Sequence, residues 1–265
     1  MRIACAQIIV PDDPADAIER CLRAVDEAAG SGARLIVLPE AALAPFGTDL
    51  RAAARENAAE FDARLTARAE ELDVVVVAGS FVPADGDASE DRVLNRVIVR
   101  GRGTRVDYDK IHLFDAFGTR ESATIAPGRA LRTVDVDGLR IGLATCYDVR
   151  FAEQFQALAD RGAQAVVLPA AWADGPGKAE QWRLLVRARA LDATVHLIAC
   201  DQAPPPVDPA PERGCGGSLV VSPLGEVRAE LGREEGILLA DFDAEEVAAV
   251  RRRLPVLAHR ADLRA

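Results

Sequence analysis

The sequence has no long apolar run and no leader-like N-terminus. None of its apolar stretches approaches the roughly 18 residues that a membrane-spanning helix needs. The first stretch, in residues 2–10, is short and ends at Pro11, without the small-residue cleavage site that closes a secretory signal. We therefore expect a cytoplasmic protein with no membrane partner.

The chain also lacks a surplus of positive charge. It carries 32 Lys and Arg residues against 42 Asp and Glu residues, a net charge of −10. A nucleic-acid binder needs a basic face to meet the phosphates, so this composition argues against a nucleic-acid partner. The composition, 49% apolar and 28% charged, is typical of a globular protein. Because no internal repeat or linker divides the sequence, we predict a single domain over residues 1–265.

Cysteine pairs with a metal-binding or disulfide spacing are missing. The five cysteines are an odd number at wide spacings, and none forms a Cys-x-x-Cys pair, which argues against a disulfide framework and against a zinc site. In a reducing cytosol they should be free thiols, by default small buried hydrophobic residues. They are Cys5, Cys21, Cys146, Cys200 and Cys215.

Histidine, the usual partner of a catalytic cysteine, occurs three times. His196 lies inside an apolar stretch and is expected to be a core residue, while His259 lies in a polar C-terminal segment and is expected at the surface. His112 is two residues from Lys110 and would share its face in a strand. Because none of these patterns supplies a base, a Cys/His hydrolase of the papain type is disfavoured, and a glutamate base with a lysine partner is the better interpretation.

Strands and helices alternate along the chain, which predicts an α/β fold with some antiparallel hairpins. The apolar runs are short and continuous, as in strands that are buried on both faces. We expect strands in residues 2–10, 34–39, 73–81, 92–100, 104–110, 131–136, 139–146, 163–169, 195–200, 217–222 and 236–242, and helices in residues 14–29, 50–72, 152–161, 178–192 and after Asp243.

A proline-rich segment interrupts this order at residues 203–213, "APPPVDPAPER". Proline at this density cannot continue a helix and is not found in central strands. We expect a surface loop.

Two predicted strands end in charged residues that hydrophobic patterning does not explain. Glu40 follows "LIVLP" and precedes the apolar "AALAPF", where the charged form of a carboxylate is destabilised, as suits a general base. Lys110 ends "TRVDYDK" and could stabilise a developing oxyanion. The alternatives are a capping or salt-bridged glutamate, and a lysine that is ion-paired with Asp107, Asp109 or Asp115.

A third predicted strand ends at Cys146, within the stretch "LATCYDVRF" of residues 143–151. Sites in α/β folds collect at the carboxyl ends of strands, so this thiol could face a cleft. Burial alone would raise its pKa and leave it inert, so a reactive thiol needs the base and the cation. For Asp148 and Arg150 we expect an internal ion pair that holds the turn.

The ordered set "LPE" at 38–40, "DKIHLF" at 109–114 and "CYDVRF" at 146–151 resembles the nitrilase, or carbon–nitrogen hydrolase, superfamily. Supporting pieces are "RIACAQ", "APG" at 126–128, "LPAAW" at 168–172, "RARALD" at 187–192 and "GGSLVVSPLGEV" at 216–227. The resemblance implies a four-layer αββα sandwich whose subunits pair through their outer helices into a homodimer or a higher homo-oligomer. It implies no metal and no organic cofactor.

The superfamily's Glu–Lys–Cys triad maps onto Glu40, Lys110 and Cys146. By this resemblance, Glu40 takes the thiol proton and Cys146 attacks the carbonyl carbon. Lys110 and the backbone N–H of Tyr147 stabilise the oxyanion.

Many members also have an accessory glutamate a few residues before a Pro-Gly element, and here that residue is Glu121. The resemblance gives it the role of orienting Lys110 or positioning the substrate. Two alternatives stay open, that Asp115 serves instead and that Glu121 is a loop residue paired with Arg120 or Arg129.

Substrate-binding residues are carried over with one departure. Trp172 and His112 lie in matching motifs, but Gln181 stands where many members have histidine, so the pocket chemistry there could differ. We see no clear basic cluster near the motifs that would bind an acidic substrate, although Arg150 and Arg183 are candidates.

The sequence Cys-Tyr-Asp at residues 146–148 favours a small-molecule amide as the substrate, since nitrilases of the superfamily usually have Cys-Trp-Glu. We therefore predict an amidase-like carbon–nitrogen hydrolase. The alternatives are an N-carbamoyl amine hydrolase, a nitrilase, a catalytically inactive ligand-binding homologue, or a redox-sensing thiol with Cys200 as a spatial neighbour.

Overall fold

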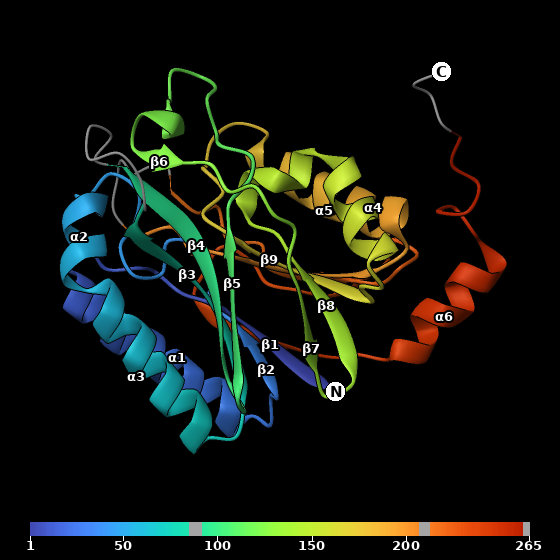
Figure 1. Cartoon of the computed structure of the whole chain (residues 1–265), viewed down its shortest axis with the longest axis horizontal. Helices are drawn as coiled ribbons and strands as arrows, with labels where there is room; N and C mark the ends of the chain where they lie inside the picture. The colour runs from blue at the N-terminus through green and yellow to red at the C-terminus, as the bar shows by residue number, and fades with distance from the viewer. Residues whose placement is uncertain (85–91, 207–212, 262–265) are drawn as a thin grey trace.

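The computed structural model describes residues 1–84, 92–206 and 213–261. Two β-sheets pack face to face, and helices cover both outer faces of the pair (Figure 1). Helices α1 to α3 lie against the first sheet, and α4 and α5 lie against the second. This arrangement confirms the predicted four-layer αββα sandwich.

The first sheet has strand order β13-β1-β2-β3-β4-β5, with β6 beside β4. Its centre, β1-β2-β3, is parallel, and β3-β4-β5 continues as the predicted antiparallel hairpins. The strands are β1 (Arg2–Gln7), β2 (Leu35–Val37), β3 (Val75–Pro83), β4 (Val93–Gly101), β5 (Thr104–Asp109), β6 (Ile125–Ala126) and β13 (Gly236–Asp241).

The second sheet has strand order β12-β11-β10-β9-β8-β7 and repeats this plan, with a parallel centre, β8-β9-β10, and antiparallel outer strands. Its strand β12 was not predicted. The strands are β7 (Thr133–Val136), β8 (Leu139–Leu143), β9 (Ala165–Ala170), β10 (His196–Asp201), β11 (Leu219–Val221) and β12 (Val227–Glu230).

The helices begin where the sequence offers a cap. Asp13 accepts a hydrogen bond from the backbone N–H of Ala15 at 2.8 Å, and Pro14 occupies the first turn, where a missing N–H costs nothing. The helix predicted over residues 50–72 is wrong in one respect, because it breaks at Asn57 into two helices. The helices are α1 (Pro14–Gly30), α2 (Leu50–Glu56), α3 (Ala58–Glu71), α4 (Ala152–Asp160), α5 (Lys178–Ala193) and α6 (Ala244–Arg253).

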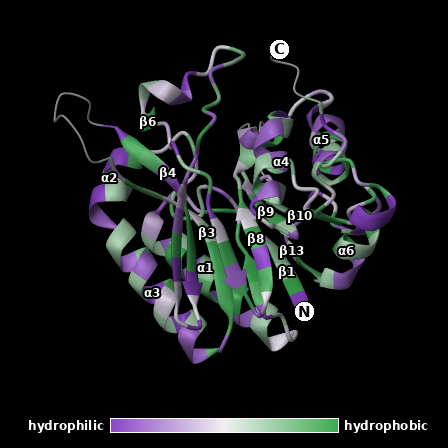
Figure 2. Ribbon diagram, turned by 45° about the vertical axis from the view of Figure 1, so that its right-hand side comes forward, coloured by the Kyte–Doolittle hydropathy of each residue, from purple (hydrophilic) through white to green (hydrophobic). Residues whose placement is uncertain are grey.

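The core has three layers because each central strand is buried on both faces. In β1, Ile3 and Cys5 point between the two sheets, whereas Ala4 and Ala6 point towards α1. The strands are accordingly apolar along most of their length, and the helices are banded, with polar residues on their outer faces (Figure 2). This pattern is the one expected of two-sided burial.

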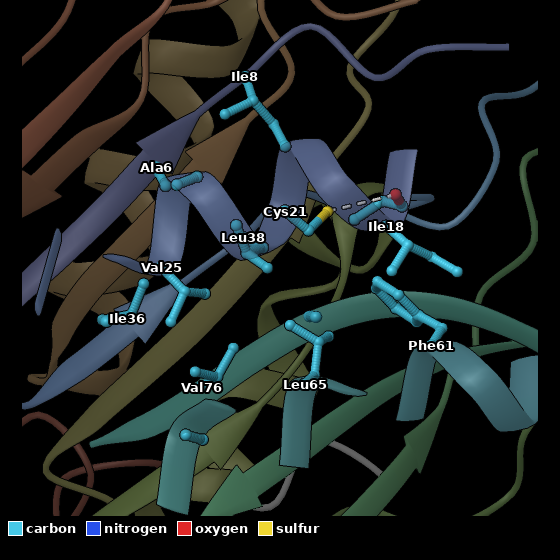
Figure 3. Packing of buried hydrophobic residues seen from close by; sticks show 14 of the residues in the cluster. Ala6, Ile8, Ile18, Cys21, Val25, Ile36, Leu38, Phe61, Leu65 and Val76 are labelled. Carbon is cyan, nitrogen blue, oxygen red and sulfur yellow. Dashed lines mark hydrogen bonds between the residues drawn. The ribbon is translucent and has the colours of Figure 1, made fainter. Parts of the chain in front are cut away.

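Figure 3 shows the layer between α1, α3 and the first sheet, where Cys21 packs among aliphatic side chains. Its Sγ atom contacts the carbonyl oxygen of Ala42 at 3.5 Å. Burial raises the pKa of the Cys21 thiol to about 12, so this cysteine is protonated at neutral pH and acts as a core residue, as the sequence predicted for it.

Two further sequence predictions concern the surface. No helix in the described part of the chain is long and apolar enough to cross a bilayer. The proline-rich loop at 203–213 lies largely outside the described residues, which omit 207–212, while residues 203–206 form no helix or strand.

Candidate active site

Glu40 is fixed in the wall between the two sheets, three residues after β2. Its side chain is fully buried, and its backbone oxygen accepts a hydrogen bond of 2.8 Å from Nε2 of Gln202. The next residue, Ala41, has a left-handed backbone (φ 55°). Gly79 makes this turn possible, because a Cβ atom there would lie 2.5 Å from the Cα atom of Glu40.

Lys110 follows β5 directly and is held through its own backbone. Its N–H donates to the carbonyl of Asn95 at 2.9 Å, and its carbonyl accepts from the N–H of Gly128 at 2.7 Å. Gly128 belongs to the "APG" motif, and a Cβ atom there would lie 2.0 Å from the carbonyl oxygen of Asp109. This explains why glycine stands at that position of the motif.

The ammonium group of Lys110 bridges two buried carboxylates. Its Nζ atom lies 2.9 Å from Oε1 of Glu40 and 2.9 Å from Oε1 of Glu121. Burial lowers the pKa of Lys110, but the charges of Glu121 and Glu40 outweigh it and hold the pKa well above its ordinary value. Lys110 is therefore a permanent cation here.

The structure separates the two acids between which the sequence did not decide. Glu121 reaches Lys110, whereas the carboxylate of Asp115 is bonded to Ser122 through its hydroxyl at 2.6 Å. The predicted alternative of an Asp107, Asp109 or Asp115 ion pair for Lys110 is wrong. Asp109 and Asp107 instead pair with Arg96.

Cys146 does not end a strand, contrary to the prediction, because β8 stops at Leu143. It opens a 3₁₀ turn, Cys146–Arg150, and its own backbone is left-handed (φ 45°). Such a conformation costs a non-glycine residue on the order of 1–3 kcal/mol. Thr145 offsets this cost by donating its hydroxyl to the carbonyl of Pro169 at 2.8 Å and its N–H to Asp148 at 2.9 Å.

The Cys146 thiol is protonated in the resting site. Burial raises the pKa of Cys146 well above its ordinary value, the nearby charge of Glu40 raises it further, and the ammonium of Lys110 opposes both effects only in part. The thiol contacts the Glu40 carboxylate and the backbone N–H of Ala171. A reaction at this sulfur therefore requires proton transfer to a base, and Glu40 is the base in contact with it.

A cavity of about 800 Å³ opens over these groups. Lys110, Glu121 and Cys146 line it, together with Tyr147 and the indole of Trp172. Glu40 is not among the lining residues, because it lies behind Lys110 and the thiol with no exposed surface. The arrangement presents a nucleophile and a cation to a bound molecule while the base stays out of contact with solvent.

The family model of the carbon–nitrogen hydrolases matches residues 2–252. The chain belongs to the carbon–nitrogen hydrolase family. It is therefore an enzyme of the nitrilase superfamily that acts on carbon–nitrogen bonds, as the three motifs predicted.

Individual relatives of this carbon–nitrogen hydrolase cover nearly its whole length. A Mycobacterium tuberculosis protein described as a hydrolase is 44% identical over 99% of this chain and 96% of its own. Human omega-amidase NIT2 is 35% identical, with the same two coverages. The solved structure of an amidase from Nesterenkonia sp. AN1, in complex with butyramide, has a TM-score of 0.78 at 26% identity, covering 96% of this chain and 95% of the other.

The Asp148–Arg150 ion pair predicted for this carbon–nitrogen hydrolase is wrong. Asp148 is fully buried and accepts hydrogen bonds from the hydroxyl of Tyr108 and from the N–H of His112. Its Oδ1 atom also lies 2.8 Å from Nδ1 of His112. Asp148 therefore ties the turn that begins at Cys146 to the segment that carries Lys110.

Three of the four predicted substrate-binding residues lie outside the described lining of the cavity. Trp172 lines it, but His112 does not, because its ring stacks on Phe151 at 3.6 Å and its Nδ1 faces Asp148. Arg150 donates to Oε1 of Gln181 at 2.8 Å, and its guanidinium lies 5.0 Å from the centre of the Trp172 ring. These two residues form a layer behind the indole.

A group of cations that the sequence analysis missed lines the cavity. They are Arg51, Arg120, Lys178 and Arg213, and beyond Glu121 the lining holds one acid, Asp49, which caps α2. Each comes from a different segment, so no local motif reveals them. A chain with a net charge of −10 thus surrounds its nucleophile with positive charge.

Two groups that hold Glu40 were also missed. The backbone N–H of Ala171 donates to Oε2 of Glu40 at 2.9 Å, and Nδ2 of Asn95 donates to Oε1 at 2.8 Å. A backbone donor leaves no trace in a sequence. Asn95 does leave one, because it interrupts the inward-facing series Val93, Val97 and Val99 of β4.

Proposed function

We propose that this protein is an amidase that hydrolyses a small carboxamide through a covalent acyl-enzyme on Cys146. The observation that carries the proposal is the position of Glu40. Its carboxylate contacts the Cys146 thiol and lies 2.9 Å from the ammonium of Lys110, so base, nucleophile and cation form one chain. A nucleophile needs such an adjacent activator when its own pKa is high.

In the acylation step, Glu40 accepts the thiol proton as the sulfur of Cys146 attacks the amide carbon. The oxygen of the tetrahedral intermediate is stabilised by the ammonium of Lys110 and by the backbone N–H of Tyr147. Glu40 then returns the proton to the departing nitrogen, and ammonia leaves. Preorganised donors of this kind are each worth about 10²–10³ in rate.

In the deacylation step, Glu40 takes a proton from a water molecule, which attacks the thioester carbon. The same two donors stabilise the second oxyanion, and the proton returns to the sulfur as the carboxylic acid leaves. The buried position of Glu40 suits both steps, because a carboxylate out of contact with bulk water is readily protonated and deprotonated.

Glu121 has the accessory role in this proposal. Its Oε2 atom accepts the N–H of Phe114, and its Oε1 atom faces Lys110 at 2.9 Å. Glu121 thereby keeps the ammonium at the cavity wall when the charge of Glu40 is neutralised by the transferred proton. Lys110 retains one anionic partner throughout the cycle.

An amide is favoured over the other carbon–nitrogen bonds for two reasons. This chain has Cys-Tyr-Asp at the nucleophile, and its relatives include omega-amidase NIT2. In the Nesterenkonia amidase, the acetamide moiety of fluoroacetamide adds covalently to the active-site cysteine. An N-carbamoyl amine or a nitrile could use the same three residues, and both belong in the test.

The charges of the cavity favour an amide whose far end is anionic. Arg51, Arg120, Lys178 and Arg213 outnumber the single carboxylate of Asp49 around the space beyond the thiol. The ammonium of Lys178 faces three aromatic rings at 5.1–5.6 Å, and none of the described carboxylates is ion-paired with it. A carboxylate-bearing amide would supply the missing partner.

We also propose that copies of this single-domain protein associate through their outer helices. Leu184 and Leu191 of α5 are exposed, at 66% and 39%, on the outer surface of the sandwich. Burying them against a second copy would remove apolar surface from water. Sedimentation equilibrium of the wild type and of L184D measures this directly. A wild-type monomer would contradict the proposal.

Ammonia release tests the activity itself. The panel contains butyramide, the monoamides of four- and five-carbon dicarboxylic acids, an N-carbamoyl amine and a nitrile, each with wild type and with C146A. We expect release from the amides by the wild type alone. Equal rates for wild type and C146A, or no release from any substrate, would exclude the amidase proposal and favour an inactive ligand-binding homologue.

A further inference from the structure

The side chain of Asn95 lies between the two carboxylates that hold Lys110. Asn95 belongs to β4 and is fully buried, in the inward-facing row of that strand. Its Nδ2 atom donates to Oε1 of Glu40 at 2.8 Å and to Oε1 of Glu121 at 3.3 Å. Its backbone carbonyl also accepts the N–H of Lys110. One residue therefore contacts all three charged members of the site.

Two donors share the same two acceptors in this arrangement. Nζ of Lys110 and Nδ2 of Asn95 both bind Oε1 of Glu40 and Oε1 of Glu121. Each carboxylate is therefore held at one oxygen by a cation and by a neutral amide. A second contact fixes its other oxygen and prevents rotation, which for Glu40 is the N–H of Ala171.

The remaining carboxylate oxygen of Glu40 is thus directed towards Cys146. The carboxylate contacts the thiol, and the same Ala171 N–H contacts both groups. Rotation of the carboxylate would break the contact with the sulfur. The alignment of base and nucleophile consequently depends on what holds Oε1, namely Lys110 and Asn95.

The neutrality of Asn95 matters because the cluster holds one cation and two anions. A second cation at this place would hold Glu40 in its charged form and oppose proton transfer from Cys146, whereas a third anion would repel both carboxylates. An amide donates hydrogen bonds and adds no charge. The opposite orientation would direct Oδ1 at two carboxylates, so the amide must point Nδ2 at them.

This orientation has a cost that the site retains. Oδ1 of Asn95 has no hydrogen-bond partner among the described residues, although it is buried. An orphaned buried acceptor is unfavourable, and an apolar side chain of similar size would remove that penalty. The retention of asparagine at this position is consistent with a role for its donor group.

We propose that Asn95 is a positioning residue, which together with Lys110 locks the Glu40 and Glu121 carboxylates and so aligns Glu40 with the Cys146 thiol. The inference rests on the proposed function, since it assumes that Glu40 takes the thiol proton. It does not depend on which substrate is hydrolysed.

Alkylation of Cys146 by iodoacetamide tests this without any amide substrate. The variants are N95L, which keeps the volume and loses the donors, and N95D, which keeps the shape and adds a charge. N57D is the matched control, because Asn57 lies at the junction of α2 and α3 and makes no capping hydrogen bond with its side chain. The second-order alkylation rate, kcat, KM and the thermal midpoint are measured for each.

We expect N95L to lower the alkylation rate and kcat in parallel, by about 10- to 100-fold, with KM within about twofold of wild type. N95D should be impaired further at pH 7, because a third carboxylate repels the other two, and should recover in part as the pH is lowered. N57D should behave as wild type.

A purely space-filling role predicts the opposite pattern. N95L and N95D would then alkylate and turn over at the wild-type rate, and that result would overturn the proposal, as would a loss in N95D no larger than that in N57D. If N95L does not fold, the shape-conserving N95D still decides between the two roles. If no amide is hydrolysed by the wild type, the proposed function fails while the alkylation comparison stands.

Discussion

The Nζ atom of Lys110 lies 2.9 Å from Oε1 of Glu40, and both side chains are buried in the wall between the two sheets. A buried ion pair of this kind adds little net stability, but breaking it is costly. K110M would leave Glu40 and Glu121 buried without a cation. We expect it to lower the free energy of unfolding by about 3–5 kcal/mol and to abolish turnover. Urea denaturation measures the first effect, and a stability within about 1 kcal/mol of wild type would contradict it.

Gly79 and Glu40 are in backbone contact, which makes a conservative change at Gly79 severe. In G79A the new Cβ would lie 2.5 Å from the Cα atom of Glu40, so the base has to move. We expect a loss of stability of at least about 1–3 kcal/mol together with a fall in kcat. The control is G30A, since no atom lies within 4 Å of a Cβ built there. Equal stability of the two variants would show that the contact at Glu40 relaxes freely.

Asp201 makes stability depend on pH. Its carboxylate is buried at the end of β10, where it accepts the N–H groups of Trp172 and Cys215. Burial raises the pKa of Asp201 to about 7, and these hydrogen bonds lower it only in part. An unfolded aspartate has a pKa of about 3.9, so between pH 4 and pH 7 the unfolded chain releases a proton that the folded protein keeps.

The folded state therefore loses stability as the pH rises through this window, by up to about 4 kcal/mol, and the loss is complete above pH 7. D201N lacks the titrating group. We expect the free energy of unfolding of the wild type to fall relative to that of D201N from pH 4 to pH 7. Parallel pH profiles for the two proteins would contradict the assignment to Asp201.

Lys178 should discriminate between charged and neutral amides. In K178M, kcat/KM for the monoamide of a four-carbon dicarboxylic acid should fall about tenfold or more, because a hydrogen-bonded charge pair is lost. The value for butyramide, which is neutral, should change little. The control is R183M on the same helix, since Arg183 pairs with Glu230 and is not among the described lining residues. An equal fall for both substrates would count against an anionic subsite at Lys178.

The sequence was sufficient for the architecture and for the position of the triad. Continuous apolar runs predicted strands buried on both faces, and the order of the motifs around Glu40, Lys110 and Cys146 predicted residues that the structure brings together. Local backbone detail was harder. The turn at Cys146 and the helix break at Asn57 depend on packing against other segments, which periodicity does not report.

The polar environment of the site was the least predictable part. Asp148 was expected to pair with Arg150 because the two are neighbours in sequence, yet it binds Tyr108 and His112 across the interface of two segments. The cavity cations come from four segments that no spacing rule connects. Asn95 is the exception, since a polar residue in an inward-facing apolar row can be recognised from the alternation of the strand alone.

The central claim is that Cys146 carries the acyl group. Its direct test is peptide mass spectrometry of enzyme quenched in acid during turnover of butyramide, with C146A measured alongside. The account predicts an acyl adduct on the peptide that contains Cys146, and a fall in kcat for C146A on the order of 10⁴-fold or more. A C146A enzyme that is folded and turns over within tenfold of the wild type, with no adduct on that peptide, would contradict it.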